Sequence, residues 1–482
     1  MHAGIAPLNI IQAWGGRDRV IKPARSCGPV RYRTDEDSLG RVKIPADAYY
    51  GPFTARAAEQ YRVTGTAAHP ALIEAYSMIK RSAAAANTKA GALDARRGRA
   101  ITRACDMVLS GRFRDQFVID MINSGAGTAF NMNANEVIAN VALEIAGRKL
   151  GDYEYIHPND HVNMSQSTND TFPTAMHVSI LGGSGRALSG VGMLVRSLKS
   201  KARSFARHKK IGRTHLMDAL PVTLGGELAA HATAASRAGA ALAYSMKGLE
   251  PVALGGTAVG TGANTPRGYR RAAIRELARI SGLRLRPEPD MQYALQSRLA
   301  VAGVSSALRN LALELGRLAN DIRLMASGPV AGLSEIGIPA VHAGSSIMPG
   351  KVNPSLAECM NMVCYSIIGN DTAAAHAVQA GQFELNVMLP GMLKSVLEST
   401  DMLASFLPVF SANLIDGLTA DKKGLRGRIE SSPVIVTLLA PRIGYSRSAE
   451  LYKESLGTGR TIRDIAVSGG LVTNKEMDKL LG

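Results

Sequence analysis

The sequence predicts an all-α fold, and three observations lead to this class. Aromatic residues make up only 5% of the 482 residues, while Ala, Leu and Met, which are good helix formers, are frequent. Apolar residues recur at steps of three and four over long stretches, which is the period of a helix buried on one side. The strand–helix alternation of a doubly wound nucleotide-binding fold is missing.

Three long helices follow from the apolar spacing. The clearest covers 301–328, with an apolar face made of Val304, Leu308, Leu311, Leu315, Leu318, Ile322 and Met325. A second, in which Thr400 is the single polar exception, carries Leu393, Val396, Leu403, Leu407 and Phe410. A third should begin after Pro173 and continue despite Gly182-Gly183, through Met176, Ile180, Leu188, Val191, Leu194 and Leu198. We predict that these helices form a central bundle in which the first two share a seam.

Polar, Gly-rich stretches lie between the helices and are longer than plain turns need to be. Catalytic and binding groups are commonly held on such loops by a rigid scaffold. The candidate functional loops are therefore 124–135, 157–174, 212–226, 255–264 and 344–354.

The formal net charge of +17 is spread along the whole chain. No block of five or six basic residues, no interleaved aromatic platform and no zinc-finger or RNA-binding signature accompanies it, so we predict no nucleic-acid partner. A small anionic substrate or a compositional bias toward Arg explains the charge equally well.

The N-terminal segment and the cysteines indicate the compartment. There is no secretory leader and no apolar run of about 18 residues, which favours a cytoplasmic protein with no membrane partner. The basic segment before Tyr32 is read as a frayed arm in preference to a targeting signal. No CxxC pair is present, so free thiols are expected at Cys27, Cys105, Cys359 and Cys364.

One loop has the composition of a carboxylate-binding site. In Gly344–Pro354, glycines free the backbone to present N–H groups toward one point, and two hydroxyls stand beside them. Lys351 and Asn353 add a cation and an amide. Composition alone is also compatible with an ordinary surface turn.

The run GSSIMPGKVNP in this loop resembles the signature loop of the fumarase/aspartase superfamily. Further segments resemble that family, in its order: 45–51 (PADAYYG), 131–140 (NMNANEVIAN), 157–170 (HPNDHVNMSQSTND), 212–218 (GRTHLMD), 255–264 (GGTAVGTGAN) and 382–388 (QFELNVM). The resemblance extends from Tyr32 to the C-terminus.

This resemblance implies a three-domain, all-α, fumarase/aspartase-like fold with a central bundle of long helices. The expected domains are an N-terminal helical domain (1–168), a long-helix bundle domain (169–423) and a small C-terminal helical domain (424–482). It further implies a homotetramer with a shared helical core, in which three subunits form each active site and a small dicarboxylate is the substrate.

The resemblance also assigns roles to residues. Ser345 is the general base that takes a proton from the carbon next to a carboxylate, and Lys351 and Asn353 hold the other carboxylate. The hydroxyls that grip the carboxylate beside the carbanion belong to Thr128, Ser167, Thr168 and Ser346. The residues that meet the other carboxylate and the leaving group are Asn169, Thr214 and His215, with Glu358 paired to His215.

These residue types suit the chemistry. Removing a proton next to a carboxylate gives a doubly charged aci-carboxylate, and hydroxyl donors fixed in advance would each stabilise it by about 3 kcal/mol. Serine is a poor base unless its pKa is depressed, which convergent loop N–H groups and the Lys351 cation would achieve. A glycine-bounded loop carrying the base predicts a lid that closes over the substrate.

Within the superfamily, local features favour aspartate ammonia-lyase over class II fumarate hydratase. They are Ala126, Thr168, the segment 380–388 and the tail 457–471. The segment 171–177 and His215 fit a hydratase equally well. The prediction is therefore elimination of ammonia from L-aspartate to give fumarate, with fumarate hydration to L-malate as the alternative. A non-catalytic structural homologue is a remote third possibility, opposed by the intact catalytic residues.

No cofactor or metal is predicted. Two Gly-x-Gly fragments, at 125–127 and 260–262, do not complete a dinucleotide fingerprint or follow a strand. The spacing of His157, His161 and His177 is not that of a metal site.

Three positions depart from the family pattern, and they bear on substrate choice: 129–130, Gly226 and 342–343. A bulky Phe130 next to Thr128 is expected to reshape the pocket.

Overall fold

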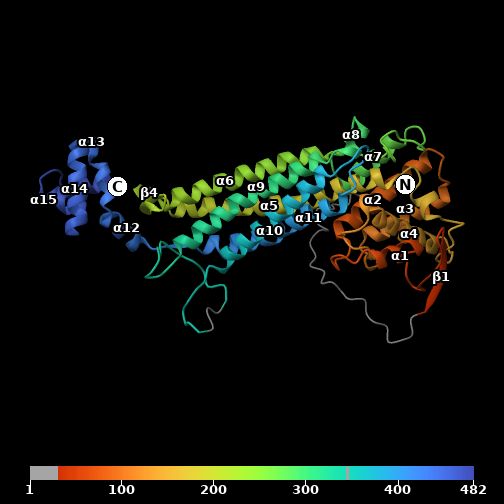
Figure 1. The fold of residues 1–482 in the computed structure, drawn as a ribbon, viewed down its shortest axis with the longest axis horizontal. Helices are drawn as coiled ribbons and strands as arrows, with labels where there is room; N and C mark the ends of the chain where they lie inside the picture. The colour runs from red at the N-terminus through yellow and green to blue at the C-terminus, as the bar shows by residue number, and fades with distance from the viewer. Residues whose placement is uncertain (1–30, 343–346, 482) are drawn as a thin grey trace, which may run out of the picture. The chain divides into compact units, whose positions relative to one another are not determined.

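The computed structural model describes residues 31–342 and 347–481. Most of them are helical, and the strands are short and pair only in two-stranded sheets (Figure 1). The predicted all-α class is therefore confirmed. Ser345, Ser346, Cys27 and the N-terminal arm lie outside the described residues.

The chain forms two compact units. The first unit comprises the described residues up to 185 with 242–308 and 367–401, and the second comprises 186–241, 309–366 and the described residues from 402. Long helices contribute segments to both units: α5 (Thr168–Ser204), α6 (Leu224–Ser245), α9 (Leu299–Met325), α10 (Ser355–Gln379) and α11 (Leu389–Asn413). The three-domain division at 168 and 423 stays a prediction.

Two of the long helices confirm the apolar spacing of the sequence. All seven predicted apolar positions of α9 and all five of α11 are buried. Thr400, the polar exception, is also buried, because its hydroxyl donates to the Val396 carbonyl at 2.8 Å within the same helix. Helix α10 packs on α9 through polar contacts: Ser305 donates to Asp371 at 2.6 Å in the first unit, and Arg323 to Asn361 at 3.1 Å in the second. The seam between α9 and α11 stays a prediction.

The start of α5 differs from the prediction. The helix begins at Thr168, five residues before the expected Pro173, which lies inside it. A capping box sets this start: Ser167 Oγ accepts from the Asn169 N–H at 3.2 Å, and Asp170 Oδ1 accepts from the Ser167 N–H at 3.0 Å. By length and composition α5 could also cross a membrane, a test that the core helix of a soluble protein passes as well; half of its most apolar window is buried in this structure.

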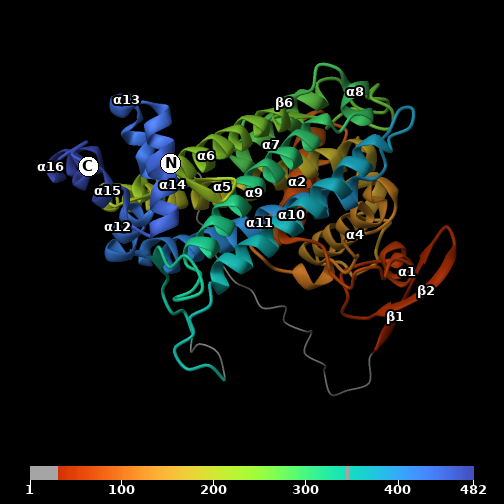
Figure 2. The same ribbon diagram turned by 60° about the vertical axis from the view of Figure 1, so that its left-hand side comes forward.

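The N-terminal part of the first unit consists of a hairpin and four packed helices. The hairpin is β1 (Tyr32–Asp37) with β2 (Gly40–Pro45) (Figure 2), and the helices are α1 (Pro52–Gln60), α2 (Pro70–Lys89), α3 (Ala95–Leu109) and α4 (Thr128–Ile145). Helix α3 packs against both α2 and α4. The buried Glu136 carboxylate accepts backbone N–H groups of Gly51, Phe53 and Thr54, and so fixes the start of α1 on α4.

An aromatic cluster fills the space between α2, α4 and α5. The rings of Tyr76 and Phe130 are 5.1 Å apart, those of Tyr76 and Phe172 6.0 Å, and those of Phe117 and Phe130 5.9 Å. Phe130 is buried in this core. Its ring packs on Tyr76 and Phe117, and its effect on a substrate pocket stays a prediction.

The rest of the first unit covers α2 and the start of α5. Helix α7 (Tyr269–Ser281) packs on α2, and α8 (Met291–Gln296) joins a small apolar cluster with Ala253. Strands β5 (Pro251–Val252) and β6 (Arg286–Pro287) pair in parallel.

The second unit contains a hairpin that the sequence did not predict. The stretch 212–226, expected to be a loop, belongs mostly to the antiparallel strands β3 (Lys209–Thr214) and β4 (Met217–Thr223) and to the start of α6. His215 and Leu216 form the turn, both with left-handed φ (55° and 62°), as a two-residue type I′ hairpin turn requires. The sequence lacks the Asn-Gly signal of such turns, which is why the hairpin was missed.

The C-terminal elements pack around this hairpin. They are α12 (Lys422–Ser431), α13 (Ala440–Ile443), α14 (Tyr445–Thr458), α15 (Ile462–Ser468) and α16 (Asn474–Leu481). Their apolar side chains form one cluster that includes Ile211 of β3. Strand β7 (Ile336–Gly337) pairs with β8 (Thr419–Ala420) and precedes the loop that leads to α10.

Candidate active site

The structure divides the predicted site residues into two groups. The first set, which we call the hydroxyl cluster, lies in the first unit and consists of Thr128, Ser167, Thr168 and Asn169. The hairpin–loop group, in the second unit, consists of Thr214, His215, Lys351, Asn353 and Glu358.

The residues of the hydroxyl cluster lie at two helix N-termini. Thr128 is the first residue of α4 and Thr168 the first of α5, so both stand at the helix end where the helix dipole favours an anion. Gly127, with φ of 79°, is the N-cap residue of α4, and a Cβ built on it would overlap the Phe172 ring of α5. The start of α4 therefore touches the first turns of α5 at a position that only glycine can occupy.

Gly127→Ala is expected to destabilise the protein by about 2–4 kcal/mol, because the added methyl group must displace a buried ring and because alanine disfavours this backbone conformation. The KM should also rise, since Thr128 directly follows. Thermal unfolding and steady-state kinetics measure both effects. Gly147→Ala, with the same sign of φ but open space around it, is the control for backbone strain alone.

A hydrogen-bond chain orients Thr168. Asn131, one turn into α4, donates from Nδ2 to Thr168 Oγ1 at 3.0 Å, and its Oδ1 accepts from Lys80 Nζ at 2.8 Å. Lys80 also donates to Asn163 Oδ1 at 2.7 Å. The Lys80 side chain is fully buried, and burial lowers its pKa from 10.5 to about 7, opposed by the nearby Asp170 carboxylate.

The pH dependence of stability follows from Lys80. Its folded pKa lies below its unfolded one, so the unfolded chain binds more protons above pH 7 and this group makes stability rise with pH, by up to about 1.4 kcal/mol per pH unit. The wild type should therefore gain stability relative to Lys80→Met between pH 7 and 8. That window lies below the ionisation of an unfolded cysteine such as Cys105. If thermal unfolding gives the wild type and Lys80→Met the same dependence of stability on pH, the low pKa of Lys80 is contradicted.

Asp170 joins the start of α5 to the segment 255–264. Its buried carboxylate accepts from the N–H groups of Gly255 and Thr257, both at 2.9 Å. Burial raises its pKa from 3.8 to about 6, partly offset by these hydrogen bonds. Asn169 donates to the Ala258 carbonyl at 2.8 Å. The Gly-rich segment 255–264 therefore holds the start of α5 through its backbone N–H groups, which donate to Asp170.

Lys80, Asn131, Asn163 and Asp170 were not predicted as site residues. The two asparagines and the aspartate lie in segments that resemble the family, which was an available signal. Lys80 stands beside Arg81 in α2, and nothing in the sequence distinguishes it from a solvated lysine.

Four of the five residues of the hairpin–loop group are solvent-exposed in the single chain. Thr214 and His215 lie at the tip of the β3–β4 hairpin, and Lys351 and Glu358 are exposed before and in the first turn of α10. Within the part of the chain that the structure describes, no hydrogen bond joins His215 to Glu358, so their pairing stays a prediction.

A network of largely buried ion pairs holds strand β3 of the hairpin in place. Lys210 of β3 lies 2.6 Å from Glu335 and 2.8 Å from Glu227, and Arg213 lies 2.8 Å from Glu335. Lys210 and Glu335 are almost completely buried. This ion-pair network joins β3 to α6 and to the segment before β7, and so holds the strand that leads to Thr214 and His215.

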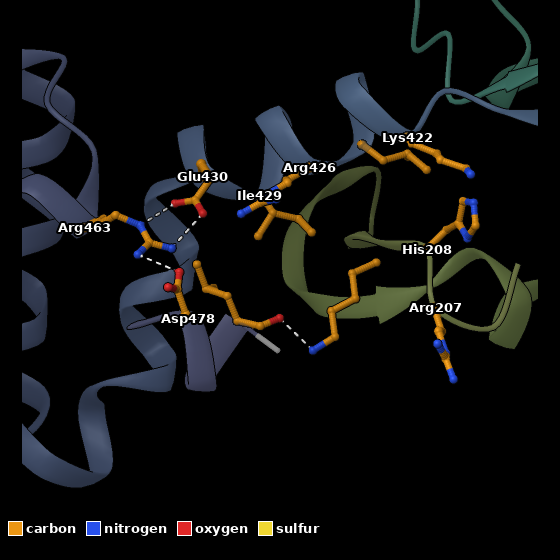
Figure 3. Close-up of a pocket in the computed structure, with 11 residues that line it drawn as sticks. Arg207, His208, Lys422, Arg426, Ile429, Glu430, Arg463 and Asp478 are labelled. Carbon is orange, nitrogen blue, oxygen red and sulfur yellow. Dashed lines mark hydrogen bonds and ion pairs between the residues drawn. The ribbon is translucent and has the colours of Figure 1, made fainter. Parts of the chain in front are cut away.

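Two pockets elsewhere do not include any predicted site residue. One, of about 380 Å³, lies in the second unit between the start of β3 and α12, with Lys422 and His208 on one side (Figure 3). Across it, Arg463 is neutralised by Glu430 and Asp478 (Figure 3). The other, of about 780 Å³, lies in the first unit along α3 and is lined by Arg96, Arg99 and Arg103, among others.

Comparison with known proteins decides the family. A family model described as lyase matches residues 40–369, and one described as the C-terminus of fumarase C matches 435–482. The chain belongs to the fumarase/aspartase superfamily. As a lyase of this superfamily, it is an enzyme of the predicted class.

The fumarase/aspartase relatives include both predicted activities. The chain is 43% identical over 93% of its length to an aspartate ammonia-lyase of Bacillus sp, covering 96% of that protein. It is 42% identical over 93% of its length to a class II fumarate hydratase of Thermosynechococcus vestitus, again covering 96% of it.

Solved fumarase/aspartase structures share the whole fold. A fumarate lyase:delta crystallin from Brucella melitensis bound to cobalt is 42% identical, with a TM-score of 0.91 over 94% of this chain and 98% of that one. A class II fumarase from Schistosoma mansoni is 33% identical, with a TM-score of 0.89 over 94% and 98% of the two chains.

Proposed function

We propose that this chain is an aspartate ammonia-lyase, which eliminates ammonia reversibly from L-aspartate to give fumarate. The observation that carries the proposal is the placement of Thr128 and Thr168 at two helix N-termini, with Ser167 beside them. Among the described residues, the hydroxyl hydrogens of these three side chains have no recorded acceptor, so they are available to a substrate carboxylate.

The choice of the lyase rests on two segments that meet in the structure. The Ala126 N–H donates to the Val387 carbonyl at 2.7 Å, which joins the 125–128 turn to the 382–388 segment. Both segments resemble aspartate ammonia-lyases more than hydratases. Together with the 43% identity to the Bacillus enzyme, they favour ammonia over water as the leaving group.

The proposed mechanism needs no cofactor. Ser345 takes a proton from C3 of L-aspartate, and the electron pair moves into the adjacent carboxylate to form an aci-carboxylate. Thr128, Ser167, Thr168 and Ser346 donate hydrogen bonds to that charge. The electron pair then returns to form the C2–C3 double bond as the C–N bond breaks and ammonia leaves.

The remaining predicted residues serve the other end of the substrate. Lys351 and Asn353 hold the second carboxylate, while Asn169, Thr214 and His215 meet it and the leaving amine. Glu358 pairs with His215 in the assembled site and orients its imidazole.

We further propose that three chains of a homotetramer form each site, in the cytoplasm. The division of the predicted residues between two units, and the exposure of Thr214, His215, Lys351 and Glu358 in the single chain, support an assembly that brings them together. Size-exclusion chromatography with light scattering tests the tetramer.

Fumarate hydratase is the second candidate. The 42% identity to the Thermosynechococcus enzyme favours it, as does the His215 segment. Ultraviolet absorbance at the fumarate band separates the two activities. Growth of the band with L-aspartate, together with ammonia release, supports the lyase, and growth only with L-malate supports the hydratase. If fumarate fails to raise the melting temperature and both substrates are silent, the non-catalytic alternative stands.

A further inference from the structure

The buried Lys80 is a charged group that the proposed mechanism does not use. Its ammonium lies in the first unit on α2, fully buried, and its hydrogen-bond partners are the side-chain oxygens of Asn131 and Asn163. No carboxylate contacts it directly among the described ion pairs; Asp170 acts on it only from a distance. Burying a charge is costly, so its retention calls for a physical reason.

Donor and acceptor rules supply that reason. In its protonated form Lys80 can only donate, so Asn131 must turn Oδ1 toward Lys80 and Nδ2 toward Thr168. Thr168 Oγ1 is then an acceptor from Asn131, and its own hydrogen must point elsewhere. Asn163 Oδ1 also accepts from Asn131 Nδ2, at 3.4 Å, and it too faces Lys80. Without the ammonium both amides could turn over, and Asn131 could then take up the Thr168 hydrogen itself.

Lys80 also holds the segment before α5. Through Asn163 it fixes one end of 163–166, while Asn87, two turns further along α2, donates to the Met164 carbonyl at 2.9 Å and accepts from Ser165 at 2.8 Å. Ser167 and Thr168 therefore follow a segment that is attached to one face of α2.

We propose that Lys80 is a positioning residue: through Asn131 it sets the direction of the Thr168 hydroxyl so that this group donates to the substrate carboxylate. The inference rests on the proposed function, since it requires Thr168 to contact the substrate. Lys80 itself does not touch the substrate and acts through Asn131.

A double-mutant cycle with Lys80→Met and Thr168→Val tests the proposal, with kcat/KM for fumarate formation as the readout. Thr168→Val should lower kcat/KM about 100-fold to 1,000-fold, the loss typical of one fixed donor. Lys80→Met alone should lower it at least about tenfold. If Lys80 acts through the Thr168 hydroxyl, adding Lys80→Met to Thr168→Val should change kcat/KM by no more than about twofold.

The outcomes are distinguishable. Fully additive losses in the cycle would mean that Lys80 is only structural, and would overturn the inference while the proposed function stands. A wild type that forms no fumarate from L-aspartate or L-malate would overturn the proposed function and the inference with it. Ser82→Ala, which removes a buried hydroxyl of α2 bonded only to its own helix, should keep wild-type kcat/KM.

A second variant covers the case in which Lys80→Met does not fold. Asn131→Ala breaks the chain between Lys80 and Thr168 without leaving a buried methionine, and the same cycle applies. Its loss in kcat/KM should also disappear in the Thr168→Val background. A loss that persists there would overturn the inference.

Discussion

Replacing Ser345 with alanine is expected to lower kcat about 100-fold to 10,000-fold, the range that a positioned general base contributes. Alanine cannot accept the C3 proton, while the carboxylate-binding hydroxyls of the first unit remain. KM should therefore change much less than kcat. Fumarate absorbance measures the turnover, and thermal unfolding shows whether the fold is retained.

Ser366→Ala is the matched control for this variant. Ser366 is an exposed serine of α10 whose hydroxyl donates only to the Met362 carbonyl of its own helix, at 3.1 Å. The control should keep wild-type kcat. A Ser345→Ala enzyme with near-wild-type turnover would show that the base is a different group.

Replacing Glu335 with alanine is expected to destabilise the protein by about 3–5 kcal/mol, because it removes one partner of a buried ion pair. Lys210 is almost completely buried and would lose its contact at 2.6 Å, while Arg213 would lose its contact at 2.8 Å. The hairpin tip with Thr214 and His215 follows directly. Turnover should therefore fall as well, measured beside urea unfolding.

The matched control for Glu335 is a surface ion pair. Glu450 lies 2.6 Å from Arg447, and both side chains are at least half exposed, so Glu450→Ala should cost about 0–1 kcal/mol. Equal losses of stability in the two variants would contradict the structural role given to Glu335.

Much of the scaffold was predictable because it depends on local repetition. The apolar faces of α9 and α11 follow from side chains spaced for one face of a helix, and the structure buries every predicted position. The start of α5 could also have been predicted from the sequence, since Ser167 and Asp170 have the spacing of a capping box. The prediction gave Pro173 too much weight as a helix start.

The hairpin and the aromatic core were harder to predict for a different reason. Leu216 adopts left-handed φ although leucine disfavours it, so the turn depends on the pairing of β3 with β4 and on the ion pairs that hold β3. Phe130 lies two residues after Thr128, which is predicted to bind substrate, yet on a helix the two side chains point in different directions. The ring packs on Tyr76 and Phe117.

By itself, the sequence determined the helical class, the long bundle helices and the superfamily, because these depend on periodicity and on motif segments that are contiguous in the chain. Only the tertiary structure decided which groups support the site. Lys80 meets Asn131 and Asn163 from positions 51 and 83 residues away, and Lys210 meets Glu335 across 125 residues. The physical reason is that a buried charge is stabilised by whatever polar atoms the fold places around it, and those partners leave no spacing in the sequence.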